Sequence, residues 1–300
     1  MTTVSAVFSP YHYAPEEFRG AVIAAERAEL PVLWLWEDCF RESAYASAAA
    51  ALAWTENLRV GVGISPFPLR NTALTAMEIA TIERMFPGRL IPGFGHGVLD
   101  WMSQVGARVA SPLTLMKESI PAIRALLQGE KCTVEGRYVT LREVALDWPP
   151  TSTPPLYAAG EGPKTLQLAG ALADGVILAG GYSPQEFGEQ IAHVQHGAAD
   201  AGKTQTPRVT MYLTASFGDG AGARVSTDLG DRGVDNARAA WGDPADVADV
   251  VRQLQQVGAN EVALVPTSAE PDLAEFFAAT SEVGRIIAEK NEENQANDGP

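Results

Sequence analysis

Two glycine-rich segments of this 300-residue chain have the composition of loops that bind phosphate groups. The first contains Gly95, His96, Gly97 and Val98 and follows a short apolar run. Alternating glycines let backbone amides approach a phosphate or a planar ring without a clash from Cβ atoms. The dinucleotide-binding fingerprint is excluded, because its spacing requires glycine where Val98 stands. A tight exit from a strand would use the same glycines, so this segment alone leaves both interpretations open.

The second glycine-rich segment precedes an expected helix and consists of Ala159, Gly160, Glu161, Gly162, Pro163, Lys164 and Thr165. Proline is favoured at the first position of a helix, so this helix is expected to begin at Pro163. The free N–H groups and the dipole of a helix N-terminus attract anions. Lys164 and Thr165 would add a positive charge and a hydroxyl group to such a site. An ordinary glycine-rich turn is the alternative.

Acidic, aromatic and imidazole side chains follow two other apolar runs. Glu37, Asp38 and Cys39 come directly after one run, and Tyr11 and His12 come after another. If both runs are barrel strands, the carboxylates project into the barrel mouth at the C-terminal ends of the strands, and the aromatic rings line a pocket there. A solvated strand end is the alternative for the carboxylates.

The histidines and cysteines have no metal-binding spacing. His193 and His196 lie three residues apart on one expected helix, without a nearby carboxylate that would complete a triad, so a solvated helix face is the better interpretation. Cys39 and Cys132 are far apart, and two thiols give no disulfide framework, which favours a reducing cytoplasm. The sequence also lacks a Ser-His-Asp arrangement and a Walker loop. We therefore expect no metal in the site.

The order of these segments along the chain predicts the elements that position them. Short β-branched or aromatic runs alternate with amphipathic helical patterns, which is typical of βαβ units and a parallel sheet. Eight strands are expected, at residues 4–8, 32–36, 58–64, 89–93, 156–159, 175–178, 208–215 and 260–265. Eight parallel strands suit a closed (β/α)8 TIM barrel, although a doubly wound sheet of about five to seven strands fits the same pattern.

The alternation stops between residues 129 and 155. Residues 131–133 and 138–141 flank a Glu-Gly pair and predict a β-hairpin inserted after the fourth βα unit. In the preceding helix, expected at residues 112–128, Pro121 predicts a kink or a break.

The whole chain is expected to form one domain. Residues 1–288 are interpreted as a single barrel that contains this insertion. Residues 289–300 are polar, which predicts a frayed, disordered tail.

The charge of the chain excludes two classes of partner. The formal net charge is −15, and no basic stripe is present, so the chain lacks the electrostatic footprint of a nucleic-acid-binding protein. An acidic surface also repels anionic membranes. The longest dense apolar stretch, residues 31–36, is too short to span a bilayer.

Taken in order, these segments resemble the bacterial luciferase-like superfamily over residues 4–289. They are most similar to its coenzyme F420-dependent branch, which includes methylenetetrahydromethanopterin reductase. The stretches that carry the resemblance are residues 155–176, 88–97 and 242–244. The resemblance implies a barrel with an insertion after the fourth βα unit, usually paired as a homodimer.

The resemblance also implies a cofactor site. The loops at residues 95–98 and 160–165 would hold the phosphate-bearing tail of the cofactor. Gly63, Ile64 and Ser65 would lie against its ring, with a non-prolyl cis peptide between Gly63 and Ile64.

We interpret the chain as a coenzyme F420-dependent oxidoreductase that transfers a hydride between the deazaflavin and a small organic substrate. Asp38 is expected near the head group and, with His12 and His96, is a catalytic candidate. Tyr11, His12 and Cys39 are expected to line the substrate pocket. An FMN-dependent luciferase-like monooxygenase and a non-catalytic flavin-binding protein are the alternatives.

Two residues depart from the patterns of the relatives. Cys39 stands where many of them have histidine directly after the acidic residue at the end of the second strand. Val98 stands where the glucose-6-phosphate dehydrogenases of the family have glutamate, which disfavours sugar-phosphate oxidation.

Overall fold

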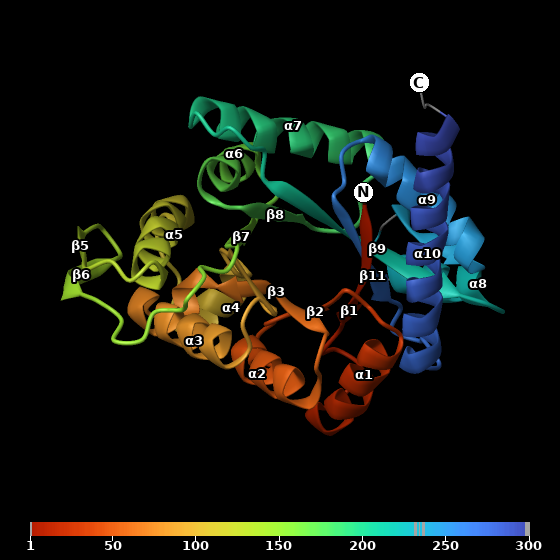
Figure 1. Cartoon of the computed structure of the whole chain (residues 1–300), viewed down its shortest axis with the longest axis horizontal. Coiled ribbons are helices and arrows are strands. Elements are labelled where there is room, and N and C mark those ends of the chain that lie inside the picture. Colours follow the sequence, from red (N-terminus) through yellow and green to blue (C-terminus); the bar gives the residue numbers. More distant parts are fainter. Residues whose placement is uncertain (1, 231–232, 234, 236–237, 298–300) are drawn as a thin grey trace.

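A closed barrel of eight parallel strands forms the centre of the molecule. The computed structural model describes residues 2–230, 233, 235 and 238–297. Each strand pairs with its neighbours in the order β1-β2-β3-β4-β7-β8-β9-β11, and β11 pairs with β1 to close the barrel (Figure 1). The strands are β1 (Thr3–Phe8), β2 (Val32–Leu35), β3 (Arg59–Pro66), β4 (Leu90–Gly95), β7 (Tyr157–Ala159), β8 (Gly175–Leu178), β9 (Arg208–Phe217) and β11 (Glu261–Pro266). The expected TIM barrel is therefore confirmed.

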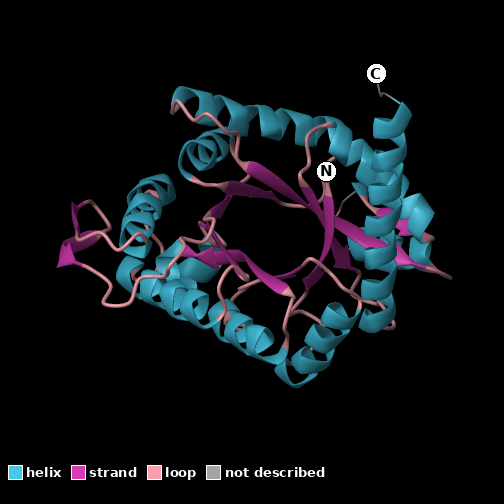
Figure 2. Cartoon of the chain, viewed as in Figure 1, coloured by secondary structure: helices cyan, strands magenta, loops and turns pink. Residues whose placement is uncertain are grey.

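Helices surround this barrel, as Figure 2 shows. They are α1 (Pro15–Arg27), α2 (Ala44–Trp54), the 3-10 turn η1 (Phe67–Leu69), α3 (Thr72–Met85), α4 (Leu99–Gln104), α5 (Pro112–Leu127), α6 (Pro163–Leu172), α7 (Pro184–Asp200), α8 (Ala221–Gly230), α9 (Pro244–Gln256) and α10 (Leu273–Asn297). A short strand, β10 (Ala240–Gly242), pairs with the end of β9. Among the residues described, no helix combines the length and the apolar character needed to cross a membrane.

The two faces of each strand pack in two different clusters of buried residues. Successive side chains of a strand point to opposite faces, so alternate residues face the helices or the barrel interior. The interior is filled by a cluster that includes the buried rings of Trp34, Tyr157 and Tyr212. These rings fit because glycines stand beside two of them: a Cβ atom at Gly61 would lie 2.3 Å from the Trp34 ring, and one at Gly175 would lie 2.3 Å from the Tyr157 ring.

A buried carboxylate lies at the amino ends of the strands. Glu261, on β11, accepts hydrogen bonds from Ser5 Oγ (2.5 Å), Trp34 Nε1 (2.7 Å) and Thr210 Oγ1 (3.3 Å). Because a buried charge is tolerated only with such partners, this network also fixes the orientation of the Trp34 ring. The part of the barrel interior near the amino ends of the strands is therefore a packed and hydrogen-bonded core.

The predicted hairpin is present. Strands β5 (Cys132–Glu135) and β6 (Thr140–Val144) form a separate antiparallel sheet, which projects from the edge of the molecule in Figure 1.

The break predicted at Pro121 is absent, and α5 is one continuous helix. Pro121 lies on the exposed face of α5, as does Lys117 one turn earlier. The Lys117 carbonyl, which loses its backbone donor, can therefore be hydrated instead.

The polar tail differs from its prediction over most of its length. Helix α10 continues to Asn297, whereas residues 289–300 were expected to be frayed. The segment is rich in glutamate, lysine and glutamine, which favour helix, so it can extend a helix whose first turns are anchored by Phe276 and Phe277. Residues 298–300 lie outside the described part of the chain.

Candidate active site

The predicted site segments gather at one end of the barrel. Because all eight strands are parallel, the loops that follow β1, β2, β3, β4 and β7 lie together at the carboxyl ends, which we call the mouth. The interior cluster ends there with three half-buried apolar side chains, Trp36, Ile64 and Ala159. They form an apolar floor for the mouth.

The loops after β1 and β2 are joined by a hydrogen bond between two predicted site residues. Tyr11 Oη donates to Asp38 Oδ2 at 2.7 Å, and the Arg41 guanidinium lies 4.0 Å from the centre of the Tyr11 ring. Burial, together with the hydrogen bond and charge of Asp38, raises the pKa of Tyr11 to about 12. Burial also raises the pKa of Asp38, although Tyr11 and Arg41 oppose this shift. At neutral pH the Tyr11 phenol is therefore protonated and is the donor of this hydrogen bond.

His12 and Cys39 lie beside this pair. His12 is exposed, and its ring centroid is 6.3 Å from that of Tyr11. Burial and the charges of Glu37 and Asp38 raise the pKa of the Cys39 thiol, so the thiol is neutral at pH 7. The Cys39–Phe40 peptide bond is cis.

The end of β3 has the geometry expected from the resemblance. The Gly63–Ile64 peptide bond is cis, and the pairing of β3 with β4 shifts register between Val62 and Ser65. Tyr212 Oη donates a hydrogen bond of 3.1 Å to the Gly63 carbonyl from inside the barrel. The strand therefore bulges where Ile64 contributes to the apolar floor.

The two glycine-rich loops follow the neighbouring strands β4 and β7 and meet at the rim of the mouth. His96 Nε2 lies 3.3 Å from Thr165 Oγ1. Burial lowers the pKa of His96, so this ring is neutral at pH 7 and its contact with Thr165 is a neutral hydrogen bond. Within the described chain, no hydrogen bond or ion pair links His96 to Asp38, so the structure forms two separate groups of predicted residues.

The second loop ends in an open helix N-terminus. As predicted, α6 begins at Pro163, and Gly162 is its N-cap residue. Lys164 is exposed and Thr165 is buried. A Cβ atom added at Gly162 would have no neighbour within 4 Å, so the space in front of the helix is free to receive a group. In the first loop, Gly97 has φ +69°, a conformation that favours glycine.

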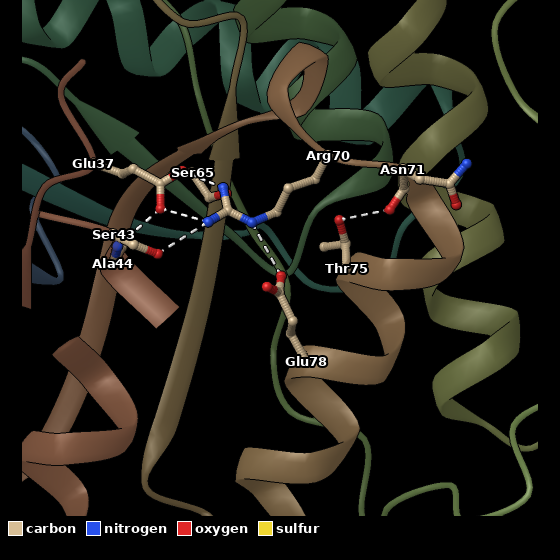
Figure 3. Close-up of polar contacts among 8 residues, drawn as sticks. All are labelled: Glu37, Ser43, Ala44, Ser65, Arg70, Asn71, Thr75 and Glu78. Atoms are coloured by element: carbon tan, nitrogen blue, oxygen red, sulfur yellow. Dashed lines mark hydrogen bonds and ion pairs between the residues drawn. The ribbon is translucent and has the colours of Figure 1, made fainter. Parts of the chain in front are cut away.

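A partly buried ion cluster centred on Arg70, which the sequence patterns do not predict, lies behind the mouth (Figure 3). Arg70 forms ion pairs with Glu37 and Glu78, and its NH2 group donates to Glu37 Oε2 at 2.7 Å. Arg70 NH1 also donates to Ser65 Oγ at 3.2 Å. One feature of the sequence does indicate a place for Arg70 near the site: it precedes the N-cap residue Asn71 in the loop after β3, at the mouth end of the barrel.

The fold is a (β/α)8 barrel, and this arrangement is a candidate ligand site at the carboxyl ends of its strands. The model of the family described as "Luciferase-like monooxygenase" matches residues 2–227. The chain belongs to this family.

Individual relatives resemble the chain over different lengths. The 5,10-methylenetetrahydromethanopterin reductase of Methanolobus tindarius is 30% identical over 179 residues, which are 60% of this chain and 54% of the relative. The chain thus spans about half the length of the curated relatives it matches.

Two solved structures share the fold. An F420-dependent secondary alcohol dehydrogenase in complex with an F420-acetone adduct has a TM-score of 0.84 and 22% identity, with 95% of this chain and 99% of that chain covered. The oxygenating constituent of 3,6-diketocamphane monooxygenase, from the CAM plasmid of Pseudomonas putida and in complex with FMN, has a TM-score of 0.78 and 16% identity, with 97% and 98% covered.

Proposed function

We propose that this protein is a coenzyme F420-dependent oxidoreductase that transfers a hydride between the deazaflavin ring and a small organic substrate. The observation that carries the proposal is the meeting of two glycine-rich loops at His96 and Thr165, beside the open N-terminus of α6. Relatives named as F420-dependent enzymes, among sequences and solved structures alike, support the choice of cofactor.

The residues present fit a ligand with a planar ring and an anionic tail. The half-buried side chains of Trp36, Ile64 and Ala159 offer an apolar surface on which a ring can lie. The first N–H groups of α6 and the exposed Lys164 would hold the phosphate of the tail. The apolar and the anion-binding parts of the mouth thus match the two ends of such a cofactor.

F420, when bound, supplies the hydride chemistry, and the protein supplies orientation and electrostatics. The Tyr11–Asp38 hydrogen bond holds a proton on Tyr11 Oη at one side of the mouth. The exposed His12 imidazole lies beside this pair. His96 stays neutral in this structure and orients the Thr165 hydroxyl beside the anion site.

Titration of the purified protein with F420 and FMN tests this proposal. We expect F420 to bind with a low-micromolar or smaller dissociation constant and FMN to bind at least about tenfold more weakly, a difference of about 1.4 kcal/mol. Calorimetry gives both constants under one set of conditions. FMN binding as tight as F420 binding would overturn the choice of cofactor.

The two alternatives predict different outcomes of that experiment. The alternative of an FMN-dependent monooxygenase draws on the family's description as luciferase-like monooxygenase and on the camphane monooxygenase, which is in complex with FMN. It predicts that FMN binds more tightly and that its reduced form consumes oxygen. A non-catalytic flavin-binding protein predicts binding without turnover.

The further properties of the enzyme stay predictions. We expect a small-molecule substrate, a cytoplasmic location and a homodimer. Leu74, Met77 and Met85 on α3 are each about half exposed, at 46%, 54% and 55%, and would support a dimer contact. Light scattering on the purified protein measures the oligomeric state.

A further inference from the structure

A single guanidinium group connects the ends of β2 and β3 (Figure 3). Arg70 contacts both carboxylate oxygens of Glu37, which follows β2, in the paired geometry that suits an arginine and a carboxylate. The same guanidinium donates to Ser65 Oγ, near the end of β3. Glu37 Oε2 in turn accepts a hydrogen bond of 2.8 Å from Ala44 N, the first residue of α2. The cluster therefore joins two strands and a helix.

The Arg70 side chain is itself held in place by residues of α2 and α3. Its Nε donates to Glu78 Oε2, on α3, at 3.0 Å, and its guanidinium lies 5.2 Å from the centre of the Tyr45 ring. Asn71 Oδ1 accepts from Ala73 N at 2.9 Å and starts α3 directly after Arg70. Burial alone would lower the pKa of Arg70, but Glu37 and Glu78 raise it, so the group stays charged.

The residues held by Arg70 are sequence neighbours of residues proposed to face the cofactor. Asp38 follows Glu37, and Ile64 precedes Ser65. Glu37 and Ser65 turn towards the helices, whereas Ile64 packs with the interior cluster and Asp38 bonds to Tyr11. Any movement of Glu37 or Ser65 would therefore displace Asp38 or Ile64.

We propose that Arg70 is a positioning residue that fixes the separation between the Asp38 carboxylate, after β2, and the Ile64 bulge on the neighbouring strand β3. This inference rests on the proposed function, because those two residues are placed against the cofactor ring there. Arg70 acts through Glu37 and Ser65 and does not touch the ligand.

Arg70→Lys is the test variant, since lysine keeps the charge but loses the planar fork that reaches two partners at once. Arg124→Lys is the matched control. Arg124 is also partly buried, and it pairs with Asp174 at 2.9 Å and donates to the Leu172 carbonyl, at the amino ends of the strands. Both variants lose a forked contact, but only Arg70→Lys loses it at the mouth.

Three measurements are compared: the melting temperature, the F420 dissociation constant and the rate of thiol labelling at Cys39 relative to Cys132. Cys39 adjoins Asp38, and Cys132 lies on the hairpin. The ratio of their labelling rates therefore reports on the loop after β2, and it can be measured in protein that holds no cofactor. We expect Arg70→Lys to weaken F420 binding at least about tenfold and to accelerate labelling of Cys39. Arg124→Lys is expected to lower the melting temperature and to leave the other two values unchanged.

Glu37→Gln is the second variant if Arg70→Lys does not fold. Its amide oxygen can still accept from Ala44 N, and we expect the same direction of change. Unchanged F420 affinity and unchanged labelling in a folded variant would overturn the inference, as would equal changes in Arg124→Lys. If wild-type protein does not bind F420, the proposed function fails, and the labelling ratio alone decides the role of Arg70.

Discussion

The Tyr212 hydroxyl, deep in the barrel, donates a 3.1 Å hydrogen bond to the Gly63 carbonyl at the start of the β3 bulge. The contact leaves no room for a side chain at residue 63, where a Cβ atom would lie 1.9 Å from Tyr212 Oη. The aromatic interior and the apolar floor of the mouth are thus coupled through one phenol.

Gly63→Ala is expected to destabilise the protein by about 1–3 kcal/mol through overpacking. Tyr212→Phe alone should cost about 1 kcal/mol for the lost hydrogen bond. Because phenylalanine removes the atom that clashes, the double variant should lose less stability than the sum of the two single variants. Urea unfolding of the four proteins measures this, and strictly additive losses would contradict the contact.

Gly162→Val tests the anion site at α6. The fold has open space there, so the melting temperature and the circular dichroism spectrum should change little. A branched side chain would occupy the space expected for the phosphate and restrict the backbone, so F420 affinity should fall at least about tenfold. Gly162→Ala should give an intermediate loss.

Gly20→Val, in the open surface of α1, is the control for this substitution and should leave F420 binding unchanged. Wild-type affinity in Gly162→Val would mean that the loop is only a turn.

Asp38→Asn tests the burial of the Asp38 carboxylate through its pH dependence. Burial raises the folded-state pKa of Asp38, so as pH rises the unfolded chain loses this proton first. The free energy of unfolding of the wild type therefore falls as pH rises from the unfolded-state pKa of Asp38 to its folded-state pKa, and it stays lowered at every higher pH. Asparagine does not ionise, so the variant lacks this loss. The melting temperature of the variant, relative to wild type, should be higher at about pH 7 than at about pH 4.

Asp100→Asn, at an exposed position on α4, is the control for that comparison. A relative melting temperature of Asp38→Asn that stays constant with pH would argue against a buried, ionising Asp38.

Cys39→Ala tests whether the thiol transfers protons. The raised pKa keeps the thiol neutral at pH 7, where it is a poor acid and a poor base. Turnover should therefore stay within about tenfold of wild type, a change in activation free energy below about 1.4 kcal/mol. A thousandfold loss with intact cofactor binding would instead assign the thiol a catalytic role.

The sequence predicts the features of this fold that local chemistry determines. Alternating strand and helix patterns locate all eight barrel strands. Asp243, directly before Pro244, has the residue type favoured at an N-cap, and it caps α9 by accepting from Ala245 N and Asp246 N. The start of α6 at Pro163 follows from the same local rules. Such features depend on residues within one turn of each other.

The Arg70 cluster could not be predicted in this way. Arg70 and Glu37 are separated by 33 residues, and they meet only because β2 and β3 pair in one register. The meeting of His96 with Thr165, 69 residues apart, likewise depends on β4 pairing with β7 across the hairpin insertion. Sequence patterns identified each loop, but the closed sheet determines which loops touch.

The filled interior of the barrel has a consequence for the order of binding. Because Trp34, Tyr157 and Tyr212 occupy the space between the strands, molecules that enter at the mouth must leave by the same opening. We expect a substrate bound near Tyr11 to cover a ring that lies on the Ile64 floor. The cofactor would then have to bind first and dissociate last, so steady-state kinetics should follow a compulsory order.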